Sequence, residues 1–151
     1  MIFGGTGYKV LLLLHLLSVV IGFGPWMLNG LLGRHALSRA SNEAKAVNAA
    51  ALDVSTASQF AIYGVVVFGI LTLVAAHKDT IKFSQGWVSV SFVLWIVIVG
   101  VLHGMALPAQ RQLRDGAGDA RALTQRFAVA SGIINVAVIV AVILMIWTPG
   151  R

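Results

Sequence analysis

Four long stretches of the chain are almost wholly apolar, and most of the charged residues fall between them. The apolar stretches cover residues 8–32, 58–76, 86–107 and 127–147. Each approaches or exceeds the roughly 20 residues that cross about 30 Å of hydrocarbon as an α-helix. A backbone inside a bilayer must satisfy its own hydrogen bonds, which favours helices over open strands. The pattern predicts an all-α fold, a four-helix transmembrane bundle formed by a single domain over residues 1–151.

Capping residues and prolines predict where these helices begin and end. Ser41 precedes the acidic and alanine-rich run NEAKAVNAAALD, as an N-cap does, so we expect the second helix to begin near residue 42. Asp119 is expected to cap a helix that continues through RALTQRF into the fourth span. Pro108 is expected to end the third helix, and Pro25 to kink the first.

The composition agrees with a membrane protein. Of the 151 residues, 58% are hydrophobic and only 11% are charged, against roughly 25% charged in a soluble domain. The net charge of +6 does not indicate nucleic-acid binding, because the basic residues lie in short loops between spans, where they direct topology. The absence of cysteine excludes disulfides, thiolate metal sites and cysteine nucleophiles. The expected surroundings are a lipid bilayer, and the expected partners are other membrane subunits or further copies of the chain.

The distribution of basic residues predicts the orientation. Four spans put both termini on one side, and the loops 33–57 and 108–127 on the other. Those two loops carry seven basic residues, Arg34, Arg39, Lys45, Arg111, Arg114, Arg121 and Arg126. The terminal side carries four, Lys9, Lys78, Lys82 and Arg151. The positive-inside rule therefore predicts that both of these loops lie in the cytoplasm and both termini on the outer side. The expected location is a bacterial inner membrane.

Polar and small residues recur at helical spacing and predict one inward-facing side on each span. On the first span, opposite the apolar Leu13, Leu17 and Val20, that side comprises Tyr8, His15, Ser18, Gly22, Trp26 and Asn29. The third and fourth spans carry the sets Ser89, Ile96, Gly100 and His103, and Ala128, Ser131, Gly132 and Asn135, while the second offers Gln59 and Tyr63. We expect Gly100 and Gly104, a GxxxG pair, to sit against another helix.

Two histidines inside the spans, His15 and His103, are the candidate cofactor-binding residues. Neutral imidazole is a common haem and metal ligand, and an ionisable residue in a membrane is a functional candidate. At 1.5 Å per residue, His15 lies about 10 Å and His103 about 25 Å below the outer boundary, so the two are not expected to bind the same iron. We expect His15 to meet Thr72 or Ser91, and His103 to meet His35. The alternative for each is a neutral imidazole that is hydrogen-bonded inside the bundle.

No catalytic residues are predicted, and the identity of any metal is left open. All five acidic residues are expected in loops, and the chain has no HExxH motif, no P-loop and no Ser-His-Asp set. A proton-driven transporter normally places carboxylates or paired ionisable groups in its spans, so conventional transport is disfavoured.

The arrangement resembles the CopD-like membrane superfamily. The resemblance rests on His15 in a first span followed by a Gly/Trp-rich stretch, on His35, on the stretch HGMALPAQRQL that begins at His103, and on the closing sequence MIWTPG. The chain is most similar to the branch of four-helix integral membrane proteins without an assigned function, and more distantly similar to the HemJ-type protoporphyrinogen oxidases. The latter resemblance implies b-type haem, with His15 matching the first-span histidine of those enzymes. HemJ-type enzymes carry a basic residue near the start of the third span. This chain lacks it and has the stretch FSQGWVSVSFV there.

Two main hypotheses follow, and a third, transport of a metal ion or small solute, ranks behind them. The first is a small integral inner-membrane protein without an evident catalytic site, an accessory subunit of a membrane complex, to which no cofactor is assigned. The second is a haem-dependent membrane oxidoreductase of HemJ-like ancestry that binds haem b through His15.

The orientation can be tested by cysteine labelling, since the chain has no cysteine of its own. A membrane-impermeant thiol reagent added to intact cells should fail to label Ser41→Cys and Gly116→Cys and should label Thr80→Cys. Labelling at Ser41→Cys and Gly116→Cys but not at Thr80→Cys would reverse the orientation.

Overall fold

The computed structural model describes residues 5–37, 42–76 and 85–147, with the side chains of 29–45, 47 and 48 left out. The described residues form the helices α1 (Thr6–Leu37), α2 (Asn42–Ala75), α3 (Gly86–Val101), η1 (Leu102–Ala106), α4 (Leu107–Asp115) and α5 (Ala120–Trp147), and no strand. Four spans within them, Thr6–Leu28, Ala49–Ala75, Gly86–Asp115 and Ala120–Trp147, are long and apolar enough to cross a membrane. The predicted all-α four-helix transmembrane bundle is confirmed.

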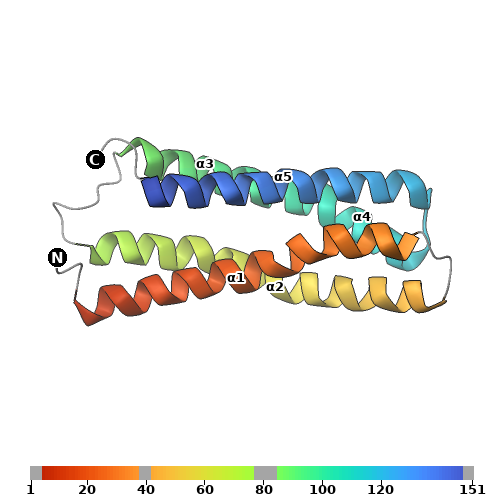
Figure 1. Cartoon of the computed structure of the whole chain (residues 1–151), viewed down its shortest axis with the longest axis horizontal. Helices are drawn as coiled ribbons and strands as arrows, with labels where there is room; N and C mark the ends of the chain where they lie inside the picture. The colour runs from red at the N-terminus through yellow and green to blue at the C-terminus, as the bar shows by residue number, and fades with distance from the viewer. Residues whose placement is uncertain (1–4, 38–41, 77–84, 148–151) are drawn as a thin grey trace.

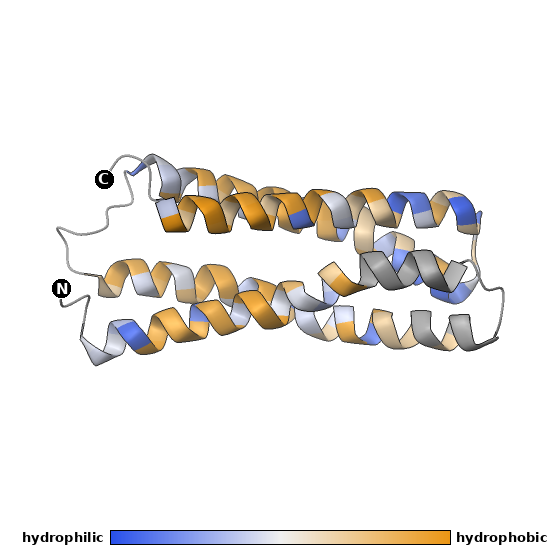
Figure 2. Cartoon of the chain, viewed as in Figure 1, coloured by the Kyte–Doolittle hydropathy of each residue, from blue (hydrophilic) through white to orange (hydrophobic). Residues whose placement is uncertain are grey.

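The helices lie side by side in an elongated bundle (Figure 1). α1 begins and α5 ends at one end of the bundle, and α4 turns into α5 at the other. Apolar residues run along the whole bundle, whereas hydrophilic residues gather in α4 and in the first turns of α5 (Figure 2). This distribution suits helices that are surrounded by lipid over most of their length.

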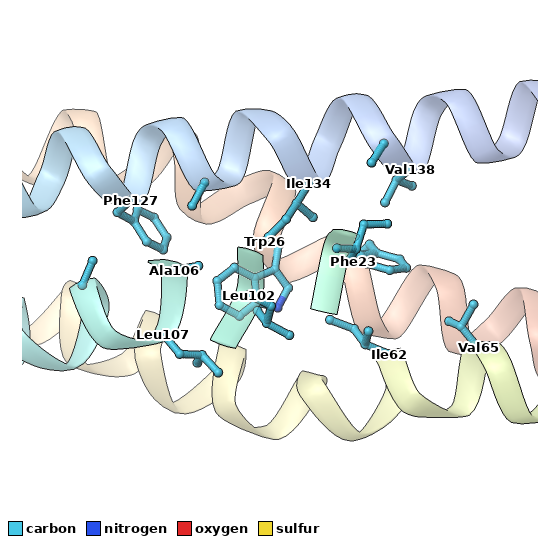
Figure 3. Close-up of a cluster of buried hydrophobic side chains, with 14 of the residues drawn as sticks. Phe23, Trp26, Ile62, Val65, Leu102, Ala106, Leu107, Phe127, Ile134 and Val138 are labelled. Atoms are coloured by element: carbon cyan, nitrogen blue, oxygen red, sulfur yellow. The ribbon is translucent and has the colours of Figure 1, made fainter. Parts of the chain in front are cut away.

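The helices pack as two pairs that α1 and α5 bring together. α1 packs along α2, α3 packs along α5, and α1 also contacts α5. α2 and α3 are not among the closely packed pairs, although Trp95 Nε1 of α3 donates a hydrogen bond to the Ile62 carbonyl of α2 at 3.2 Å. The shared core lies where the pairs meet, and Trp26, Ile62, Leu102 and Ile134 are fully buried there (Figure 3).

Glycines allow α1 and α2 to approach each other closely. A Cβ added at Gly22 would lie 3.0 Å from both the backbone nitrogen and Cγ1 of Ile62. A Cβ at Gly64 would lie 3.0 Å from Ser18 Oγ. Small residues at a membrane helix interface permit this kind of backbone contact.

The expected contact of Gly100 and Gly104 with another helix is wrong within this chain. Both glycines are exposed, and a Cβ at either would meet no atom within 4 Å. α3 and η1 instead turn bulky residues inward, Trp87, Val88, Ile98 and Leu102. Every face of this span is apolar, so helical spacing alone could not tell the lipid side from the core side.

Pro108 does not end the third helix. The Leu107 N–H donates to the carbonyl of Leu102, five residues back, in a π-helical turn that adds one residue before the proline. Pro108 then falls in the first turn of α4, where its missing N–H is tolerated. The helix ends at Gly116 in the left-handed conformation, φ 66°.

The structure also bears on the expected ends of α2 and α5 and on Pro25. α2 begins at Asn42 as expected, and the Asp119 carboxylate accepts a hydrogen bond from the Arg121 N–H at 2.9 Å, as an N-cap does. The expected cap Ser41 lies outside the described residues. α1 continues through Pro25 as one helix. Asp53 falls within the membrane-length span Ala49–Ala75 and Asp115 ends the span Gly86–Asp115, which corrects the expectation that all acidic residues lie in loops between the spans.

The close approach of α1 and α2 should make Gly22 intolerant of a side chain. Gly22→Ala should lower the free energy of unfolding in detergent by about 1–3 kcal/mol, because its Cβ crowds the Ile62 backbone. Gly100→Ala is the matched control and should not lower the free energy of unfolding, which it can raise by up to about 1 kcal/mol because alanine favours the helix over glycine. Equal effects of the two variants would contradict this packing.

Candidate ligand-binding cavity around His15

α1 presents His15 to the interior of the bundle, as its sequence predicted. His15 is 7% exposed, and Ser18 and Trp26 on the same side are also buried. Leu13 and Val20 on the opposite side are 56% and 68% exposed. The side chain of Asn29 lies outside the described residues. The polar side of the first span is therefore the packed side.

His15 forms a hydrogen bond with the backbone of α2. Its Nδ1 lies 2.8 Å from the carbonyl oxygen of Val65. A carbonyl oxygen can only accept, so Nδ1 carries the proton. No acidic side chain is among the described residues around the ring, and a buried charge without a partner is costly, so the imidazole is neutral. Its other nitrogen, Nε2, therefore holds a free lone pair.

A glycine on α2 makes room for the ring. A Cβ at Gly69 would lie 3.2 Å from both Nδ1 and Cε1 of His15. The expected partners Thr72 and Ser91 do not bond to the imidazole. Their hydroxyls donate to the carbonyls of Phe68 at 2.6 Å and Trp87 at 2.8 Å. A β-hydroxyl on a helix readily bonds to the turn before it, which leaves the main chain of α2 as the partner of His15.

His15 lines a partly open cavity of about 280 Å³ that is formed by residues of α1, α2 and α3 together with Met145 of α5. The cavity lies toward the end of the bundle where α1 begins and α5 ends (Figure 1), because Tyr8, Trp87 and Met145 near that end line it. Thr72 and Ser91 line it too, so the sequence placed the right residues at the depth of His15. Aromatic side chains form much of the wall: Tyr8, Trp87, Phe92 and Trp95. Its volume is near the lower limit of ligand pockets, roughly 300–1,000 Å³.

His103 lies elsewhere. It is exposed on η1, and its Nε2 is 2.6 Å from the hydroxyl of Tyr63 on α2, with the two rings nearly parallel at 3°. The expected partner His35 has its side chain outside the described residues. The structure does not bring His15 and His103 together in the cavity, since His103 is not among its lining residues. Sequence reasoning noted Tyr63 as a polar residue of the second span but did not pair it with His103.

Several buried polar atoms of the core have no hydrogen-bond partner among the described residues. They are Trp26 Nε1, Gln110 Oε1, Ser131 Oγ and Asn135 Oδ1. Ser131 and Asn135 belong to the predicted inward side of the fourth span, whereas Gly132 of the same set is exposed. The described part of the chain holds no group of three or more His, Cys, Asp or Glu residues arranged to bind a metal ion.

Comparisons of this chain with protein families, with characterised proteins and with solved structures give no significant match.

Proposed function

We propose that the protein is a non-catalytic integral membrane protein that holds a mainly apolar molecule in the His15 cavity, as an accessory component of a membrane complex. One observation carries the proposal: a neutral imidazole with a free Nε2 lone pair lies in a cavity with largely apolar and aromatic walls. Ligand pockets combine such walls with a few placed polar groups. The proposed setting is a bacterial inner membrane, with the turn between α4 and α5 in the cytoplasm.

The positions of the acidic groups support a binding role over catalysis. Asp53, Asp115 and Asp119 are exposed, and none is among the described residues that line the cavity. The described residues of the cavity therefore offer no carboxylate to work with His15 as an acid–base pair. Large apolar side chains such as Phe60 and Ile146, 71% and 70% exposed, cover the outside of the bundle and suit contact with lipid or with neighbouring membrane subunits, including further copies of the chain.

A second candidate, b-type haem binding, is favoured by the hydrogen bond of His15. Metal-bound histidines usually donate their other ring N–H to a carboxylate, a carbonyl or water, as Nδ1 does here. The thioether of Met145 lines the same cavity, and His with Met is a known pair of haem ligands. The donor set therefore fits haem, with His15 and Met145 as the residues that would hold it, although α2 and α3 would have to separate to admit a porphyrin. Bound haem would supply one-electron chemistry. The resemblance to HemJ-type enzymes supports this candidate as well.

A visible spectrum of the purified protein separates the two candidates. Binding of a colourless apolar molecule predicts no Soret band, even in protein from cells that were supplied with a haem precursor. Haem binding predicts a Soret band that is lost in His15→Ala and retained in His103→Ala, because His15 lines the cavity and His103 does not.

Mass spectrometry of organic extracts tests the cavity itself. Protein isolated with its surrounding lipid should retain an apolar molecule that Gly69→Val loses, because a side chain there displaces the imidazole. Gly100→Val is the control and should retain the molecule, since Gly100 faces no other part of the chain. If the wild type and both variants yield identical extracts, the cavity does not hold a ligand.

A further inference from the structure

The polar atoms that the cavity offers to a ligand are mostly acceptors. Nε2 of His15 carries a lone pair because Nδ1 carries the proton. Thr72 and Ser91 donate their hydroxyl protons to carbonyls of their own helices, so their oxygens can only accept from a ligand. Three side chains of three different helices thus present acceptors to one space.

The ring nitrogens that could donate are already used. Trp95 Nε1 donates to the Ile62 carbonyl at 3.2 Å, and Trp87 Nε1 donates to Gln85 Oε1 at 3.0 Å. Among the described lining residues, this leaves the hydroxyl of Tyr8 as the one uncommitted donor. A ligand that brings only acceptors would leave lone pairs facing lone pairs, which is unfavourable in an apolar site.

The walls indicate the shape of the ligand. Trp87, Phe92 and Trp95 on α3 form one side of the cavity, and aliphatic and small residues of α2, among them Val66 and Gly69, form another. Aromatic walls favour a flat ring that packs in an offset or edge-to-face arrangement. A volume of about 280 Å³ accommodates a small aromatic ring system with short substituents, since a cavity of about 150 Å³ holds benzene.

From these features we infer that the cavity binds an aromatic alcohol, a phenol or a quinol, whose hydroxyl donates a hydrogen bond to Nε2 of His15. The ring lies against the aromatic side chains of α3, and an apolar tail on the ring extends toward lipid between α2 and α3, which do not pack closely. An ammonium group would also donate, but no carboxylate among the described lining residues balances its charge. This inference rests on the proposed binding function of the cavity and adds the chemical class of the ligand.

A pair of probes that differ only in the donor tests the inference. Binding of para-pentylphenol and of its methyl ether, para-pentylanisole, is measured by tryptophan fluorescence with the protein in lipid nanodiscs, since Trp87 and Trp95 line the cavity. Empty nanodiscs correct for partition into lipid. The phenol should bind about tenfold more tightly than the ether, the factor that a hydrogen bond of about 1.4 kcal/mol gives.

Two variants test whether His15 accepts the hydrogen bond from the phenol. His15→Phe keeps a ring but removes Nε2, so this variant should bind the phenol and the ether with about equal affinity. His103→Phe removes a histidine outside the cavity and should keep the full preference. A loss of the preference in His103→Phe but not in His15→Phe would overturn the assignment.

Failure of this inference can be distinguished from failure of the proposed function. If the wild type binds both probes with equal affinity, the cavity binds ligands but does not require a donor, and only the inference is wrong. If neither probe binds while the wild type retains an apolar molecule that Gly69→Val loses, again only the inference is wrong. If neither probe binds and nothing is retained, both are wrong.

Discussion

The hydrogen bond between His15 Nδ1 and the Val65 carbonyl is the interaction on which the proposed site depends. It joins α1 to the backbone of α2, and it orients a ring that would be costly to leave unpaired in an apolar interior. It also decides the position of the ring proton, because the carbonyl cannot donate. The lone pair on Nε2, and with it the acceptor character of the cavity, follows from this one bond. The same bond would orient the ring for a metal.

The packing of the helices explains why there is space beside that ring. Glycines at positions 22, 64 and 69 draw α1 and α2 together, and α3 pairs with α5. In the middle of the bundle, Trp26, Leu102 and Ile134 fill the region between the pairs. Nearer the end where α1 begins, the facing residues of α2 and α3 do not close the space, and the cavity lies there. Close packing within the pairs α1–α2 and α3–α5 thus leaves the cavity between the two pairs.

The sequence predicted the spans and the inward side of α1 because the polar residues of that helix contrast with a wholly apolar opposite side. The same reasoning was wrong for α3, where Ile96 and Gly100 face outward and Trp87 and Ile98 inward. No face of α3 is polar enough to mark the core, so the choice depends on how bulky side chains of several helices fit together. Counting residues along each span correctly placed His15, Thr72 and Ser91 at the same depth in the bundle. The sequence did not identify the Val65 carbonyl as the hydrogen-bond partner of His15, because every residue has a backbone carbonyl. The π-helical turn before Pro108 was not predicted either, because it depends on how the helix accommodates the missing N–H of the proline.

The most direct test of this account is nitrogen-15 NMR of the protein with labelled histidine in lipid bilayers. His15→Phe assigns the signals of the buried ring by their loss. The account predicts a neutral imidazole protonated at Nδ1, with Nε2 at the chemical shift of an unprotonated nitrogen that moves when a hydrogen-bond donor is added. A ring protonated at Nε2, or at both nitrogens, would contradict it, because the cavity would then present a donor where the structure indicates an acceptor.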